Sequence, residues 1–188
     1  MEIQKGLHRM ASLNEMNYCM VCGEKLQMKY HPDEGSDIPY CLRCQDYRFP
    51  VFSAGVSMII TDPSGEKILL IRQYGGSEYI LCAGYINKGE DAEQAAVREV
   101  REELGLDVKE LSFNHSRYFA PSNTLMFNFT AVVDDTDAVP NQEIDSWKWF
   151  TKEEARKNIR KNSLAQAFVN GYLDGTYDFP DTPARPYR

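Results

Sequence analysis

Short apolar stretches alternate with polar and turn-forming stretches along this chain, and their spacing predicts both strands and helices. Residues 54–61 and 67–73 are rich in aliphatic side chains, and the DPSG sequence at 62–65 between them predicts a β-hairpin. Further strands are expected at residues 79–83, 108–118, 125–133 and 147–150. In the segment 125–133, residues of different character alternate with the period of two that is typical of a strand.

Residues 91–105 follow the period of an α-helix instead. Asp91 is expected to cap the N-terminus of this helix with Gln94 as its reciprocal partner, and Gly105 is expected to end it. The apolar face that we expect to pack on a sheet consists of Val97, Val100 and Leu104. The opposite, acidic face is then expected to turn toward a cleft.

Two more helices are predicted after the last strand. Thr151 opens the first, with Glu154 placed for a capping box, and the second covers about residues 163–173. The order of strands, helix, strands and helices predicts an α/β fold, an α/β/α sandwich around a mixed sheet. Residues 1–16 are read as a polar N-terminal arm and residues 179–188 as a Pro-rich tail, and neither is assigned any chemistry.

The composition is that of a globular protein, because 43% of the 188 residues are hydrophobic and 26% are charged. This length suits one full domain plus a small module. The net charge of -7 argues against broad electrostatic binding to nucleic acid or to an anionic membrane surface. The apolar runs are strand-sized and none follows a basic start, so we expect a soluble, cytoplasmic protein without a membrane partner.

Four of the five cysteines form two Cys-x2-Cys pairs with eighteen residues between them: Cys19, Cys22, Cys41 and Cys44. Two intervening residues let both sulfurs of a pair reach one tetrahedral ion, and Gly23 eases the first turn. We therefore predict a closed, structural Zn²⁺ site in a ribbon at residues 17–50, with disulfides as the alternative in an oxidising compartment. Low basic content favours a scaffold or a dimer-forming role for this ribbon over an RNA clamp.

Two other residues with ligand chemistry receive plainer interpretations. His31 is expected to be a surface histidine in a polar loop, although it is able in principle to replace a cysteine ligand. Cys82 lies in a strand-like segment and is expected to be a small buried hydrophobe.

Glu99, Glu102 and Glu103 stand at i, i+3 and i+4, so on a helix they project from one face as close neighbours. Like charges at this spacing destabilise a helix unless they are compensated. Arg98 and hard divalent cations, which prefer oxygen ligands, are the candidates. An ordinary solvated, Glu-rich helix is the alternative.

Residues 84–106 read GYINKGEDAEQAAVREVREELGL, and every specified position matches the Nudix box, Gly-x5-Glu-x7-Arg-Glu-apolar-x-Glu-Glu-x-Gly-apolar. The chain thus resembles the Nudix hydrolase superfamily, and a zinc ribbon directly before such a domain resembles its NADH pyrophosphatase branch. The resemblance implies a Nudix α/β/α sandwich with a mixed sheet at residues 51–178. It covers about residues 17–175.

The resemblance also implies which residues hold Mg²⁺ or Mn²⁺ for catalysis. Glu99 and Glu103 are the strongest ligand candidates, and the Ala83 carbonyl and Glu143 complete the set. Glu102 shares a metal or acts as the general base, and the choice between Glu102 and Glu143 as base stays open. Arg98 is expected to orient the glutamates, Glu90 to hold the loop through hydrogen bonds, and Gly84 to allow the turn from strand to loop.

For the substrate, the resemblance implies an aromatic pair, Phe49 and Tyr85, for stacking on a base or nicotinamide ring. The specificity motif of the branch corresponds to residues 116–124, where both ends agree and most of the middle differs. Its candidate contacts here are Arg117, Tyr118, Phe119 and Thr124. Ala165 matches an alanine that borders the substrate.

These matches predict a metal-dependent diphosphatase that cleaves NAD(H) or a related dinucleotide to nicotinamide mononucleotide and AMP. Because the motif at 116–124 departs from the branch, hydrolysis of ADP-ribose, FAD or another nucleoside-diphosphate derivative is the alternative. A non-catalytic, zinc-containing nucleotide-binding module is a further alternative, against which the intact glutamates speak. By analogy with the branch we expect a homodimer, and no nucleic-acid partner except a nucleotide-capped RNA end.

Overall fold

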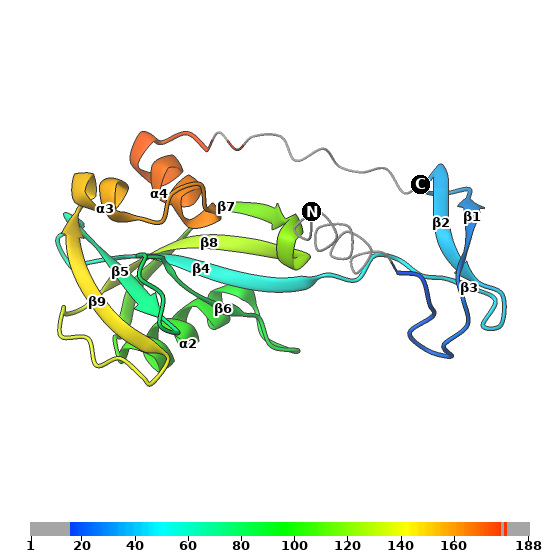
Figure 1. The fold of residues 1–188 in the computed structure, drawn as a ribbon, viewed down its shortest axis with the longest axis horizontal. Helices are drawn as coiled ribbons and strands as arrows, with labels where there is room; N and C mark the ends of the chain where they lie inside the picture. The colour runs from blue at the N-terminus through cyan, green and yellow to red at the C-terminus, as the bar shows by residue number, and fades with distance from the viewer. Residues whose placement is uncertain (1–15, 178, 180–188) are drawn as a thin grey trace, which may run out of the picture. The chain divides into compact units, whose positions relative to one another are not determined.

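The computed structural model of the protein describes residues 16–177 and 179, which fall into two compact units (Figure 1). The smaller unit ends at Phe52, and the larger one runs from Ser53 to Phe179. The polar arm and the Pro-rich tail expected from the sequence lie outside the described residues, apart from Met16 and Phe179.

The smaller unit is a three-stranded antiparallel sheet of β1 (Gln27–His31), β2 (Ser36–Cys41) and β3 (Asp46–Tyr47). Its buried apolar side chains include Ile38, Cys19 and Cys41. Units below about 40 residues usually need a metal, a disulfide or a partner to remain folded. The expectation for His31 is wrong, because this residue ends a strand and its ring packs on Tyr47 at 4.5 Å between centroids.

The larger unit is built on a six-stranded sheet in the order β7-β8-β4-β5-β9, with β6 beside β4. β4 and β8 run parallel, and the other paired strands run antiparallel, so the sheet is mixed. The strands are β4 (Ser53–Thr61), β5 (Lys67–Gln73), β6 (Cys82–Tyr85), β7 (Val108–Phe119), β8 (Thr124–Val133) and β9 (Ile144–Thr151). The last seven residues of β4 are buried, as expected for a central strand.

The predicted hairpin between β4 and β5 is confirmed, since Ile60 pairs with Leu69 and Thr61 pairs with Ile68. Asp62 holds the turn because its carboxylate accepts hydrogen bonds from the Lys67 amide at 2.8 Å and from a serine hydroxyl at 2.6 Å.

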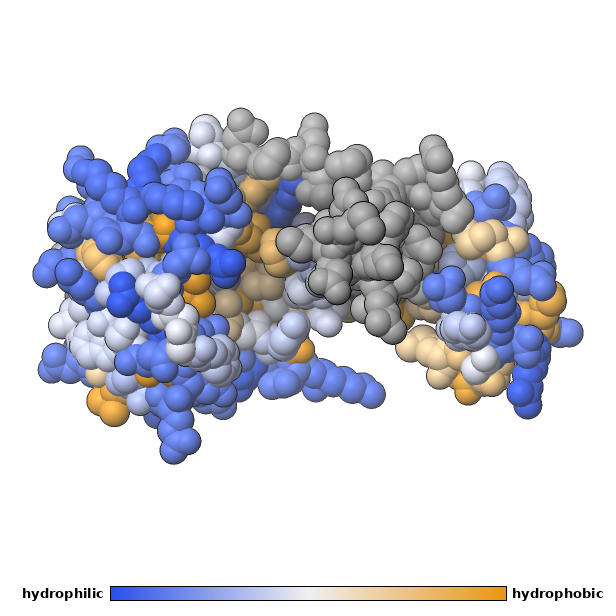
Figure 2. Space-filling view, in the orientation of Figure 1, coloured by the Kyte–Doolittle hydropathy of each residue, from blue (hydrophilic) through white to orange (hydrophobic). Residues whose placement is uncertain are grey.

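Helix α2 (Ala92–Leu104) covers one face of the sheet, and α3 (Lys152–Asn158) and α4 (Leu164–Asp174) cover the other (Figure 1). A separate apolar cluster fills each interface, one around Phe129 and Val100 and the other around Phe168 and Ile59. The face of the larger unit seen in Figure 2 is mainly hydrophilic. The predicted α/β/α sandwich with a mixed sheet is therefore confirmed.

The predicted ends of the long helix are also confirmed. The Asp91 amide donates to the Gln94 side chain at 3.1 Å in a capping box, and Gly105 ends α2 at a φ of 68°. Thr151 and Glu154 form the capping box predicted for α3.

Two details of the predicted pattern are wrong. Val97 is 38% exposed, because the buried stripe of α2 follows i, i+4 steps through Ala96, Val100 and Leu104, and Val97 lies one residue around the helix from it. The strand predicted at 79–83 begins later, because Tyr79 and Ile80 form only isolated bridges before β6. Among the described residues, no helix is long and apolar enough to cross a membrane.

Candidate active site

The candidate site lies where α2 crosses β6. Alternate residues of a strand face the same side and are separated by about 6.8 Å, which nearly equals the rise of about 6 Å between positions i and i+4 of a helix. Cys82 on β6 therefore lies against Glu103 on α2, and Gly84 lies against Glu99. This match places two of the three clustered glutamates against β6, which pairs with β4.

Glu99 lies directly on Gly84. A Cβ built on residue 84 would overlap all three atoms of the Glu99 carboxylate group. Gly84 lies inside β6 and is not among the glycines with positive φ, so the expectation that it allows a turn is wrong. Its missing side chain provides the space in which the carboxylate meets the peptide backbone next to Ala83.

Glu103 is the buried member of the cluster, with 5% of its surface exposed. Its Oε2 accepts a hydrogen bond from the Cys82 thiol at 3.2 Å. Burial raises the pKa of Glu103, the Cys82 hydrogen bond lowers it, and the negative charges of Glu99, Glu143 and Glu102 raise it, so that the pKa is about 7. A cation beside this buried carboxylate would stabilise its charged form.

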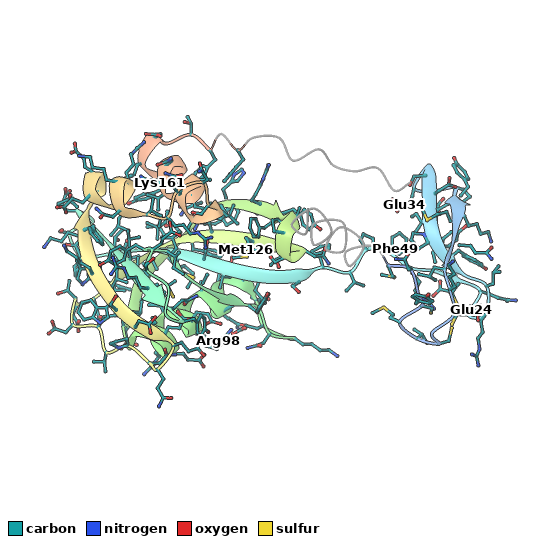
Figure 3. The ribbon with its side chains drawn as sticks, viewed as in Figure 1. Glu24, Glu34, Phe49, Arg98, Met126 and Lys161 are labelled. Atoms are coloured by element: carbon teal, nitrogen blue, oxygen red, sulfur yellow. The ribbon has the colours of Figure 1, made fainter. Side chains whose placement is uncertain are left out.

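Arg98 links the remaining carboxylates, and Figure 3 shows it on α2 below the sheet. It binds Glu90 through two nitrogens, at 2.7 and 2.9 Å, and its Nη1 donates to Glu99 at 2.7 Å and to Glu102 at 3.0 Å. Its Nη2 also donates to the Tyr85 carbonyl at 3.0 Å. Glu90 in turn accepts the Asn87 amide at 3.0 Å, so one network joins the loop after β6 to the acidic face of α2.

The fourth glutamate comes from the segment that precedes β9. This segment is attached to the end of α2, because the Val139 amide donates to the Leu104 carbonyl at 2.8 Å and the Asn141 amide donates to the Glu103 carbonyl at 2.9 Å. Glu143 follows, and its Oε2 accepts the Tyr74 hydroxyl at 2.6 Å. The negative charge of Glu143 is one of the causes that raise the pKa of Glu103.

The donor set fits hard divalent cations. All the side-chain donors are carboxylates, and Gly84 leaves room for Glu99 beside the backbone. In the described part of the chain, the buried Glu103 has only a thiol as its hydrogen-bond donor, and a cation would offset the charge of this carboxylate. Glu99, Glu103, Glu143 and the Ala83 carbonyl are the groups that would hold such ions. Among the described residues, the glutamate oxygens are not gathered within 4.8 Å of one another as the cysteine sulfurs are.

Most candidate substrate residues share the other face of the sheet, because residues paired across strands point to the same side. One row across β7, β8, β4 and β6 contains Arg117, Met126, Gly55 and Tyr85. The next row on the same face contains Phe119 and Thr124. Met126, which Figure 3 marks in the sheet, packs in the same cluster as Ala165 of α4, so this face carries both sets.

Two candidates do not join this group. Tyr118 falls between the two rows and points to the α2 face, where its hydroxyl donates to Asn123 at 2.6 Å. Phe49 belongs to the smaller unit, where it is 50% exposed and its ring lies 6.0 Å from that of His31.

The smaller unit gathers the four paired cysteines. Their sulfurs all lie within 4.8 Å of one another, with Cys19 and Cys44 separated by 3.9 Å and Cys22 and Cys41 by 3.4 Å. Tetrahedral Zn²⁺ with bonds of about 2.3 Å places its sulfurs about 3.8 Å apart. All four thiols are free, so the alternative of disulfides is wrong, and the set fits zinc. Gly23 has a φ of 75°, which confirms its predicted role in the first turn.

Arg48 contacts the cysteine cluster through a hydrogen bond. Its guanidinium, 9% exposed, donates to Cys19 Sγ at 3.2 Å and to the Tyr47 carbonyl at 2.9 Å, and it pairs with Asp46. Burial raises the pKa of the Cys19 thiol, but the hydrogen bond from Arg48 and those from the Cys22 and Val21 backbone lower it to about 6. Arg48 therefore favours the thiolate that a metal needs.

Sequence reasoning missed three side chains, of which Cys82 and Tyr74 contact the glutamates of the acidic cluster. Cys82 is buried, as predicted, but its thiol also binds Glu103. Tyr74 binds Glu143, and the only signal was a bulky residue in a YGG turn. Arg72 stacks on the Tyr79 ring at 4.0 Å, and among the described side chains its Nε is one of four buried polar atoms without a hydrogen-bond partner. The signal for Arg72 in the sequence is a charged residue at the end of an apolar strand.

An acidic helix against β6, an arginine that holds its carboxylates and a buried glutamate suit a hydrolase that works with divalent cations. The NUDIX domain profile matches residues 51–168. The chain therefore belongs to the Nudix family of hydrolases, as its sequence predicted, and these enzymes need a divalent metal.

Relatives with known names point the same way. The NAD-capped RNA hydrolase NudC of Pseudomonas aeruginosa is 30% identical over 159 residues, which are 83% of this chain and 55% of that protein. The NAD-capped RNA hydrolase ndx-9 of Caenorhabditis elegans is 31% identical over 147 residues, 75% of this chain and 38% of that protein. The chain thus spans about half the length, or less, of these curated relatives.

Solved structures agree on the fold. A Nudix hydrolase from Nitrosomonas europaea superposes with a TM-score of 0.63 at 20% identity, covering 88% of this chain and 97% of that one. A second Nudix hydrolase of the same organism gives a TM-score of 0.56 at 24% identity, covering 73% of this chain and 98% of that one. At these identities the likeness concerns the fold alone.

Proposed function

We propose that this chain hydrolyses the diphosphate bridge of NAD(H) or a related dinucleotide to nicotinamide mononucleotide and AMP, with Mg²⁺ or Mn²⁺ held by its glutamates. One observation carries the proposal: the Glu99 carboxylate lies on the Gly84 backbone, one helical turn from the buried Glu103. Among the ion pairs of the described residues Glu103 has no basic partner, so its charged form is costly to bury, and a bound cation would offset that cost.

The residues of the chain divide the work as follows. Bound cations supply positive charge that offsets the charge of the diphosphate. Glu99, Glu103, Glu143 and the Ala83 carbonyl hold them, and Arg98 fixes Glu99 and Glu102 in place from the side. Glu102, which is exposed, or Glu143 accepts the proton of the attacking water.

Support for a dinucleotide comes from the names of the relatives and from the candidate residues on the α3 and α4 face of the sheet. Tyr85 is 61% exposed at the end of β6, and it shares a face with Arg117 and Thr124. An exposed aromatic ring suits stacking on a base or a nicotinamide ring, and the guanidinium of Arg117 suits a phosphate. Phe49 stays a predicted stacking residue of the smaller unit, and Tyr118 is the weakest of the predicted contacts.

ADP-ribose, FAD or another nucleoside-diphosphate derivative is the second candidate substrate. The observation that favours it is that residues 116–124 depart from the branch motif and place only some of their side chains on the candidate face. Two further proposals accompany the main one. The chain forms a homodimer, which light scattering would check. It also accepts an NAD-type cap at an RNA end.

The test is a panel of NADH, NAD⁺, ADP-ribose, FAD and NAD-capped RNA incubated with Mg²⁺ or Mn²⁺, with products identified by mass. The proposal is supported if NADH releases AMP and nicotinamide mononucleotide, or NAD-capped RNA releases nicotinamide mononucleotide and leaves a 5′-monophosphate RNA, faster than ADP-ribose or FAD is cleaved. Glu103→Gln should abolish turnover while the circular dichroism spectrum stays unchanged. The matched control is Glu110→Gln, which alters an exposed glutamate of β7. No cleavage of any diphosphate by the zinc-loaded protein would refute the proposal.

A further inference from the structure

The turn after β5 has an unusual residue at its most constrained position. The Gly76 amide donates to the Gln73 carbonyl at 2.9 Å, and the two residues between them, Tyr74 and Gly75, have φ angles of 52° and 73°. Positive φ at both central positions is the requirement of a type I′ turn, which favours Asn, Asp or Gly there. A tyrosine at the first of these positions is strained.

Packing of the ring does not explain why this strain is tolerated, because Tyr74 is 72% exposed. What the side chain reaches is Glu143, whose Oε2 accepts the Tyr74 hydroxyl at 2.6 Å. Strained residues that persist without a packing role are typical of functional sites. The side-chain hydroxyl is therefore the part of Tyr74 that needs an explanation.

The surrounding contacts hold both ends of this hydrogen bond. On the turn side, the Gly75 amide donates to Asp145 Oδ2 at 2.6 Å, and the pairing of β5 with β9 shifts register between Arg72 and Gln73. On the other side, the Glu143 amide donates to Asn141 Oδ1 at 2.9 Å. The position of the Glu143 carboxylate is thus set by a local framework that includes Tyr74.

We propose that Tyr74 is a positioning residue for Glu143: its hydroxyl holds one carboxylate oxygen and leaves the other to bind a divalent cation. The inference rests on the proposed function, because Glu143 has this role only in a cation-dependent hydrolase. Outer partners of metal ligands orient the ligand and typically change metal affinity or activity by about tenfold to a hundredfold when they are removed.

The simpler alternative is that Tyr74 only shapes the turn. Two substitutions separate the readings. Tyr74→Phe removes the hydroxyl and keeps the ring and the backbone strain. Tyr74→Asn relieves the strain and is expected to leave the melting temperature equal or higher. If the hydroxyl is what matters, both variants lose function even though only one of them changes the turn.

The experiment is a double-mutant cycle on the zinc-loaded protein with Tyr74→Phe, Glu143→Gln and both together. Binding of Mn²⁺ alone is followed by the electron paramagnetic resonance of the free ion, and kcat and KM are measured on the best substrate of the panel. We expect Tyr74→Phe to weaken Mn²⁺ binding and lower kcat by about tenfold. We expect the double variant to match Glu143→Gln alone, because Tyr74 acts only through Glu143.

Wild-type Mn²⁺ affinity and kcat in Tyr74→Phe would overturn the inference. So would a double variant whose loss is the product of the two single losses, because Tyr74 would then act independently of Glu143. Failure of the proposed function has a different signature, since a protein that cleaves nothing on the panel still gives the Mn²⁺ binding cycle. The binding cycle alone then decides whether Tyr74 positions Glu143.

Discussion

The carboxylate of Glu99 fills the space that a Cβ on residue 84 would take. The glycine of β6 and the glutamate of α2 are thus matched in shape, and the match holds a charged group against the backbone of β6. The same strand face carries Cys82 against Glu103, so two contacts hold the acidic face of α2 on β6.

Gly84→Ala is expected to fold and to lose activity. The new methyl group displaces the end of a flexible side chain, so the free energy of unfolding should fall by only about 1 kcal/mol. Displacement of a cation ligand by about 1 Å costs on the order of a hundredfold in rate, and this is the loss expected in kcat/KM. Steady-state kinetics and urea unfolding of the two proteins measure both quantities.

The control for this prediction is the double variant Gly84→Ala/Glu99→Gln. If the alanine acts by moving Glu99, then the double variant should be no less active than Glu99→Gln alone. A further loss in the double variant, or full activity in Gly84→Ala, contradicts the relationship.

Glu103 should make the protein less stable as the pH rises when only zinc is bound. Its pKa is about 7 in the folded state, above the ordinary value of 4.5, mainly because the side chain is buried. The folded state therefore holds the proton more tightly, and stability falls as the pH rises from about 4.5 to 7. The free energy of unfolding of Glu103→Gln relative to wild type should increase over this window, as measured by urea unfolding at a series of pH values.

Saturating Mn²⁺ should remove this difference, because the cation replaces the proton as the partner of the carboxylate. A constant difference between the two proteins from pH 4 to 8 would show that the pKa of Glu103 is not raised in the folded protein.

The pair of Arg98 and Glu90 should depend on pH in the opposite sense. Hydrogen bonds from Arg98 first, and then from the Asn87 backbone, lower the pKa of Glu90 from 4.5 to about 2. The stabilisation from this pair is present above pH 4.5 and is lost as the pH falls toward 2. Arg98→Met should therefore lower the melting temperature at pH 7, and the gap to wild type should narrow in acid.

Arg98→Met should also reduce kcat by about tenfold, because it frees Glu99 and Glu102. Arg101→Met is the control, since Arg101 belongs to the same helix but is 73% exposed and contacts only Asp107 among the ion pairs of the described residues. Equal effects of the two substitutions would mean that the contacts of Arg98 with the glutamates are irrelevant to turnover.

The smaller unit should carry one zinc ion per chain and should hold it less tightly without Arg48. The guanidinium donates to Cys19 and favours its thiolate, so Arg48→Met is expected to weaken zinc affinity by about tenfold. Competition with a chromogenic chelator measures this affinity, and Arg43→Met, at an exposed position, is the control. Zinc content equal to wild type after Cys41→Ser would contradict the four-thiolate site.

Much of the fold of the larger unit can be predicted from the sequence. The hairpin at 62–65, the capping boxes of α2 and α3 and the sandwich all depend on local periodicity and turn chemistry, which neighbouring residues determine. The cysteine spacing likewise anticipates the gathered thiols, because a tetrahedral ion requires tight turns between its ligands. Val97 was misplaced because helical periodicity defines an apolar stripe only to within one residue.

The sequence by itself determined the family, the fold class and the acidic helix, because each depends on residue types at short, fixed spacings. Only the tertiary structure decided what surrounds the glutamates: Gly84 beneath Glu99, Cys82 beside Glu103 and Tyr74 at Glu143. Those contacts join residues between 15 and 69 positions apart, and strand register and helix placement set them through packing of the whole sheet. No local pattern carries that information.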